Sequence, residues 1–318
     1  MSGGVSTRRA SLAAVLLLVF LTGCSTDSVA VGVGGSSLVT LDLQGLKPLG
    51  GNLNYQAWLV SQNGTTLIGT PVVVFNVNDL GLMVDPVADT LISGPWLANA
   101  GVEAVLGVAI SLEMSSQLVV YSSNTFILSG EVAQGSATLT TGDAVALNTS
   151  FSNTSGRYAL LTPTDQDPEN ELSGLWFMDT ATDPAGPGLD IPSAPVGWIY
   201  EGWVEAGGQP ISTGKFGDPT LADSSSAYSG TLAGPSFPGE DFLTDAPQGF
   251  QFPLDLAGAD VYVTLEPWME FDNDPAEPFF LKVLAGQVPA DPVPSTLYDL
   301  LSLADQLPSG TATIQDAS

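Results

Sequence analysis

The chain contains no histidine and a single cysteine, Cys24. The missing imidazole excludes Ser-His and Cys-His nucleophile pairs and zinc centres built on histidine. A lone cysteine forms no disulfide within the chain, although an exported protein would permit one. The composition therefore predicts a protein that is not an enzyme and that has no cofactor.

Basic residues are also scarce, with 6 Lys and Arg against 34 Asp and Glu and a formal net charge of −28. Phosphate binding needs the opposite sign, so nucleic acid is excluded as a partner. Anionic lipid headgroups would repel the same surface, and salt would screen its self-repulsion. Two explanations of the acid excess stay open, a saline habitat and the binding of divalent cations.

Long apolar runs are absent except near the N-terminus. Arg8 and Arg9 precede the apolar stretch 11–21, which is too short to cross a bilayer and ends at Leu21-Thr22-Gly23-Cys24. This order is typical of a bacterial lipobox. We expect residues 1–23 to be a lipoprotein signal peptide, Cys24 to carry lipid, and residues 24–37 to be a tether. The paired arginines leave the export route open between the general and the twin-arginine pathways.

Cleavage before Cys24 leaves four basic residues against 34 acidic ones, a net charge of −30. No later segment approaches the roughly 18 uninterrupted apolar residues of a spanning helix. The sequence therefore predicts an exported protein on the extracytoplasmic side, held to a membrane through lipid on Cys24. Whether this is an inner or an outer membrane stays open.

The remaining chain is predicted to be all-β. Hydrophobic residues make up 44% of the chain, which argues against disorder. Short runs rich in Val, Thr and aromatic residues alternate with Gly, Asn and Pro, as expected for antiparallel strands. Its length favours two domains. We predict two tandem antiparallel β-sandwich repeats at 38–150 and 156–314.

The second repeat is expected to duplicate the first, because four blocks recur in the same order. The paired blocks are 55–60 with 200–205, 108–113 with 261–266, 127–132 with 283–288, and 135–139 with 310–314. The aligned pairs include Trp58 with Trp203 and Gly130 with Gly286. Between the last two blocks the second copy carries residues 295–307, where leucines at helical spacing precede Pro308. We predict a short helix there.

The second copy resembles a known family through Tyr200-x-x-Trp203, Gly214-Lys215-Phe216, 261–267 and 283–286. These motifs are similar to the extracytoplasmic C-terminal domain of anti-sigma-K factors, and they cover about 90 residues of the chain. The resemblance implies a β-sandwich. It does not extend to sigma-factor control, because the cytoplasmic segment and membrane helix of that family have no counterpart here.

Two acidic clusters are the candidates for cation binding. Asp272, Asp274 and Glu277 place oxygen ligands close together, as Ca²⁺ requires, but Pro275 interrupts the pattern of a calcium loop. The acids at 165–171 form the other cluster. A solvated acidic loop is the favoured interpretation of both.

The aromatic residues Trp58 and Trp203 recur in both copies, which favours a place in each core over a carbohydrate platform. The loop region 162–195 is the candidate contact surface, because binding residues concentrate on loops. The leading functional hypothesis is a non-catalytic binding or structural envelope module whose partner is an envelope protein or a polymer. The alternative is a carboxylate-dependent hydrolase that acts on envelope glycans.

Overall fold

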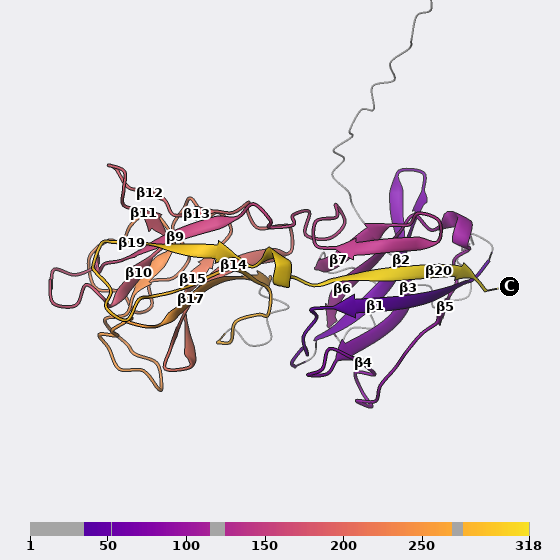
Figure 1. The fold of residues 1–318 in the computed structure, drawn as a ribbon, viewed down its shortest axis with the longest axis horizontal. Coiled ribbons are helices and arrows are strands. Elements are labelled where there is room, and N and C mark those ends of the chain that lie inside the picture. Colours follow the sequence, from indigo (N-terminus) through magenta and orange to yellow (C-terminus); the bar gives the residue numbers. More distant parts are fainter. Residues whose placement is uncertain (1–34, 52, 115–124, 269–275, 318) are drawn as a thin grey trace, which may run out of the picture.

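The structure is a computed structural model that describes residues 35–51, 53–114, 125–268 and 276–317. The predicted signal peptide 1–23, Cys24 and most of the predicted tether lie outside these residues. The described chain is nearly all β and forms two large antiparallel sheets, which Figure 1 shows side by side along the long axis. The all-β, sandwich-like class predicted from the sequence is confirmed. No helix in this part of the chain has the length and apolar character needed to cross a membrane.

The first unit is a nine-stranded sheet with the order β4-β3-β2-β6-β7-β8-β20-β1-β5. Its strands are β1 (Ser37–Gln44), β2 (Leu53–Asn63), β3 (Thr66–Val77), β4 (Met83–Val84), β5 (Trp96–Ala98), β6 (Gly107–Met114), β7 (Phe126–Glu131), β8 (Ser136–Thr140) and β20 (Ser309–Asp316). A short 3-10 helix, η1 (Val102–Ala104), precedes β6.

The second unit has the order β15-β14-β17-β18-β19-β9-β10-β16. Its strands are β9 (Ser155–Leu160), β10 (Gly174–Trp176), β14 (Trp198–Ala206), β15 (Gln209–Phe216), β16 (Gly239–Asp241), β17 (Asp260–Pro267), β18 (Lys282–Gln287) and β19 (Leu297–Ser302). The short strand β13 (Leu189–Asp190) also pairs with β9, and β11 (Met178–Asp179) pairs with β12 (Gly186–Pro187).

From β3 and β15 onward, the strands of the two units correspond one to one in sheet order. The corresponding pairs are β3 with β15, β2 with β14, β6 with β17, β7 with β18, β8 with β19, β20 with β9, β1 with β10, and β5 with β16. The irregularities match too. The pairing of β2 with β3 shifts register between Ala57 and Trp58, and that of β14 with β15 shifts between Gly202 and Trp203. A bulge at the same aligned position is unexpected in unrelated sheets, because an extra residue in one strand moves the side chains that follow it to the opposite face of the sheet. Strand order and bulge position thus agree between the two units, as the predicted duplication requires.

The C-terminal part of the chain differs from the prediction. Residues 297–302 form strand β19 in place of the predicted helix 295–307, and only the 3-10 helix η2 (Ala304–Gln306) follows. Leu300 is buried and its neighbour Leu301 is 71% exposed, which is the alternation of a strand. The leucines of this short segment fit a helical and an extended period equally well. Pairing with β9 and β18 therefore decides the conformation.

The predicted boundary of the second repeat at residue 314 is also wrong. Strand β20 pairs with β1 and β8, so it belongs to the first sheet. In Figure 1 the yellow C-terminal strand leaves the second unit and lies beside the indigo β1. The predicted match of 135–139 with 310–314 is therefore not an equivalence between copies, since these segments pair with each other.

Candidate functional site

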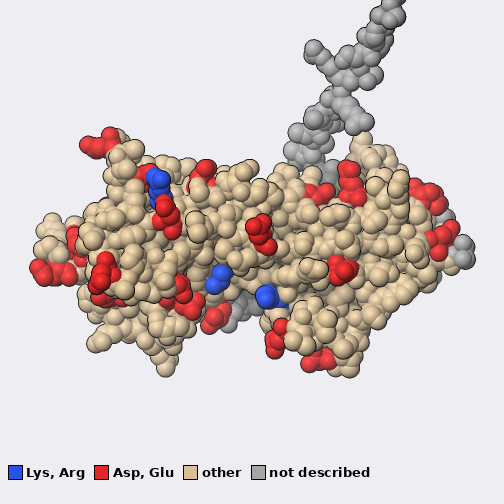
Figure 2. Space-filling model, in the orientation of Figure 1, with Lys and Arg blue, Asp and Glu red and all other residues tan. Residues whose placement is uncertain are grey.

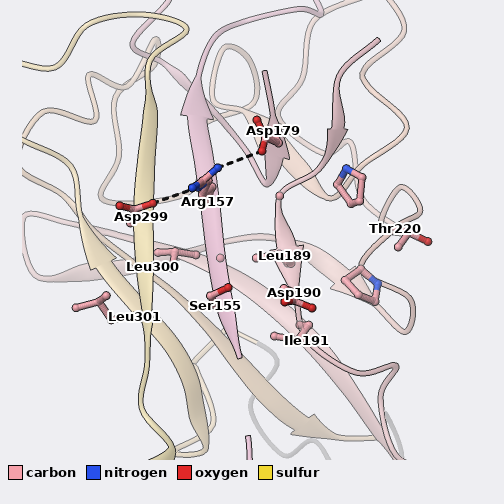
Figure 3. Close-up of a pocket in the computed structure, with 14 residues that line it drawn as sticks. Ser155, Arg157, Asp179, Leu189, Asp190, Ile191, Thr220, Asp299, Leu300 and Leu301 are labelled. Atoms are coloured by element: carbon pink, nitrogen blue, oxygen red, sulfur yellow. Dashed lines mark hydrogen bonds and ion pairs between the residues drawn. The ribbon is translucent and has the colours of Figure 1, made fainter. Parts of the chain in front are cut away.

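The main groove of the second unit has a volume of about 600 Å³ and is shown in Figure 3. Strands β9, β13 and β19 and the β11–β12 hairpin form its walls, and the loop at Pro219 and Thr220 closes one side. Asp179 and residues 187–191 come from the predicted contact loop 162–195. The structure thus brings part of that loop together with β9 and β19.

Arg157 lies in this groove and is the only arginine after Arg9. Gly156 and Tyr158 on the same strand face the interior, so alternation directs Arg157 outward. Its Nη1 lies 3.3 Å from Asp179 Oδ2 and its Nε lies 3.3 Å from Asp299 Oδ1. Asp299 is directly opposite Arg157 in the β9–β19 pairing, which makes this a cross-strand ion pair.

The guanidinium is held in place but remains accessible. The Arg157 side chain is 52% exposed, and among the described residues only the two aspartates bond to it. Ion pairs at this exposure contribute about 0–1 kcal/mol each. Arg157 therefore contributes little to stability, and its remaining N–H donors are available to a bound molecule.

The groove is negatively charged in spite of Arg157, because Asp190 joins Asp179 and Asp299 in its lining. Figure 2 shows acidic side chains over the visible face of both units and few basic ones. The groove therefore offers N–H donors beside carboxylate acceptors, a set that suits hydroxyl and amino groups better than anions. None of its described lining residues is aromatic, so it lacks the stacking wall of a typical glycan cleft.

A second feature is a buried hydrogen-bond chain that occurs in both units. In the second unit Trp203 Nε1 donates to Thr264 Oγ1 at 2.9 Å, and that hydroxyl donates to Glu266 Oε1. In the first unit Trp58 Nε1 donates to Ser111 Oγ at 2.9 Å, and this hydroxyl donates to Glu113 Oε1 at 2.5 Å. The recurrence supports the predicted structural role of the two tryptophans.

Within the residues that the structure describes, the second unit places an ion pair beside this hydrogen-bond chain. Lys215 Nζ lies 3.3 Å from Glu201 Oε2, whereas the aligned positions in the first unit hold Gln56 and Val74. Burial raises the pKa of Glu266 to about 7, against the lowering effect of hydrogen bonds from Thr264 and from the backbone of Phe279. These side chains are enclosed, so the cluster is a polar part of the interior and offers no open reaction site.

A third feature is a pair of carboxylates beside β16, the buried Asp241 and the half-buried Asp223. Asp241 accepts hydrogen bonds from the Thr164 backbone N–H and hydroxyl and from Trp176 Nε1. Asp223 accepts from the backbone N–H groups of Ser225 and Gly239. Burial raises the pKa of Asp223 to about 7 and also raises the pKa of Asp241. Asp223 attaches the loop 217–238 to β16, and Asp241 attaches the loop at Thr164 to the same strand. Residues 175–177, at the end of β10, are buried and belong to the core.

The sequence-predicted sites have mixed outcomes. Cys24, Asp272 and Asp274 lie outside the described residues, and Glu277 is exposed. In the cluster at 165–171, Asp165 and Glu171 accept hydrogen bonds from their own loop. No described group of three or more acids, cysteines or histidines is arranged to hold a metal ion. Arg157 was not among the sites predicted from the sequence, although it is the only arginine after Arg9 and could have been singled out for that reason.

These observations define the class: an all-β protein with two large antiparallel sheets of matching strand order, and with an open groove of mixed charge on the second unit. No family model matches the chain, and neither does any curated protein or solved structure.

Proposed function

We propose that this protein is an exported lipoprotein, held by lipid on Cys24 on the extracytoplasmic side of a membrane, and that it acts as a non-catalytic binding module of the cell envelope. The anchor follows from the leader and its lipobox. The resemblance to the C-terminal domain of anti-sigma-K factors is part of this proposal, because that domain also lies outside the cytoplasmic membrane.

The observation that carries the binding role is the groove around Arg157. Two aspartates orient its guanidinium, and a pre-oriented group loses less freedom when a ligand binds. The groove combines donors with carboxylate acceptors and carries an excess of negative charge. We propose that it binds an envelope polymer or protein through hydroxyl or amino groups.

The test uses the full mature chain with Cys24→Ser, immobilised and exposed to detergent-solubilised envelopes. Arg157→Gln removes the guanidinium at a stability cost of about 1 kcal/mol or less. Glu103→Gln, an exposed carboxylate on η1 of the first unit, is the control that also changes one charge. Bound components are compared by mass spectrometry and by sugar analysis.

We expect Arg157→Gln to lose the component that the parent chain and the control retain. Recovery of the same components with all three chains would remove the groove from the proposal. A thermal melt of each variant separates lost binding from lost folding.

A further inference from the structure

Two strands of this chain are exchanged between the units. Strand β9 follows β8 in the chain, yet it lies in the second sheet between β19 and β10. Strand β20 follows β19, yet it lies in the first sheet between β8 and β1. Because β19 occupies the place of β8, and β10 that of β1, the strands β9 and β20 fill equivalent positions. Each unit is thus completed by the strand that follows the other.

The equivalence extends to individual residues. Gly156 of β9 lies opposite Leu300, and Gly310 of β20 lies opposite Leu139. Aligned on these glycines, Ser155-Gly156 matches Ser309-Gly310. At the other end Leu160 pairs with Leu175 of β10, as Ile314 pairs with Val39 of β1.

One pair of aligned residues explains which strand enters which unit. Tyr158 is fully buried opposite Tyr298, whereas Ala312 is fully buried opposite Ala137. In the first unit β9 would force a tyrosine into the space of an alanine, and in the second unit β20 would leave a cavity. Side-chain volume therefore selects the exchanged arrangement.

The contacts of β20 are those of a bound peptide. It pairs with β1 along its whole length, from Ser37↔Asp316 to Gln44↔Ser309, and its other edge pairs with β8. Only Ala312 and Ile314 are buried, so backbone bonds provide most of the attachment and two side chains provide the selectivity. Residues 303–308 alone connect it to β19.

We propose that the slot between β1 and β8 is a binding site for an extended peptide strand with a small residue and, two positions later, an aliphatic residue. The C-terminal strand is its resident ligand, and the C-terminal strand of a second copy can replace it. Such a replacement joins two copies through an exchanged strand, which is a route to dimers when a hinge allows it. This inference does not depend on the groove around Arg157.

The first test keeps the full chain, in a Cys24→Ser background, with a protease site inserted in 303–308. After cleavage of the folded protein we expect β20 to stay bound during gel filtration. We then expect it to be replaced by an excess of a fluorescent peptide of residues 307–317. A peptide with Ala312→Arg should be incorporated at least about tenfold less, because it buries an unpaired charge.

The matched control is a peptide with Thr313→Lys, because Thr313 is exposed. It should be incorporated like the parent peptide. Release of β20 on cleavage, without any change in the tryptophan fluorescence of the protein, would overturn the proposal. Equal incorporation of all three peptides would overturn it as well.

The second test concerns the second copy. Thr40 and Thr313 lie directly opposite each other in the β1–β20 pairing, and both are exposed. One copy with Thr40→Cys and another with Thr313→Cys are refolded together, again with Cys24→Ser. We expect a disulfide between the two copies whose yield rises with protein concentration. No such disulfide at any concentration, while a single copy with both cysteines does form one, would overturn the exchange between copies.

Discussion

Replacing Glu266 by Gln should remove a large part of the pH dependence of stability between the ordinary glutamate pKa of 4.5 and the folded-state pKa of about 7. The side chain is 2% exposed, and burial disfavours its ionised form. In the unfolded chain the carboxyl ionises near its ordinary pKa. Between the two values the folded state holds a proton that the unfolded state has lost.

The sign follows from this difference in bound protons. Below pH 4.5 both states are protonated and Glu266 costs nothing, whereas above pH 7 the folded state carries a buried charge. Stability therefore falls as the pH rises through this window. The difference between the two pKa values corresponds to about 3 kcal/mol.

The assay is urea unfolding of the parent chain and of Glu266→Gln at pH 4.5 and pH 8, at fixed salt. Gln keeps the Oε1 acceptor for Thr264 and for the backbone of Phe279, so the charge is the main change. The stability of Glu266→Gln minus that of the parent should increase by about 3 kcal/mol from the lower to the higher pH. The pH dependence contributed by the acids at β16 is the same in both proteins, so it cancels in the difference.

Glu277→Gln, at an exposed position, is the control and should shift stability by no more than about 0.5 kcal/mol at either pH. The reasoning is refuted if the difference between the Glu266→Gln variant and the parent is the same at both pH values within that margin.

Three further predictions concern the anchor, the charge and the sheet. Labelling with a palmitate analogue should mark the parent chain, and Cys24→Ser should lose the label and leave the membrane fraction; an unlabelled parent that still sediments with membranes would contradict the anchor. The melting temperature should rise from dilute buffer to molar KCl, because salt screens the acidic surface, and a flat curve would exclude that account. Gly130→Ala should lower the free energy of unfolding by about 3 kcal/mol or more, because the added Cβ would lie 1.9 Å from the carbonyl oxygen of Thr138. Gly217→Ala, whose Cβ would have no atom within 4 Å, should change it little in the same urea assay.

The candidate site was only partly predictable. Loops carry binding residues, so the loop region 162–195 could be selected from the sequence, and it does line the groove. Arg157 and Asp299 are 142 positions apart in the chain and meet only through the pairing of β9 with β19. Likewise, the buried state of Glu201 and Glu266 could not be predicted, because most of the 34 acidic residues are expected to be solvated.

The all-β class could be predicted from short β-rich runs bounded by turn residues, and the repeated order of motifs favoured a duplication, because both are properties read along the chain. Trp58 and Trp203 could be aligned for that reason, and they occupy equivalent strands. Tertiary structure alone decided that residues 297–302 form a strand and that Ser309–Asp316 completes the first sheet. Strand pairing is long-range, and the choice between the strands β9 and β20 depends on whether the space at one core position fits Tyr158 or Ala312.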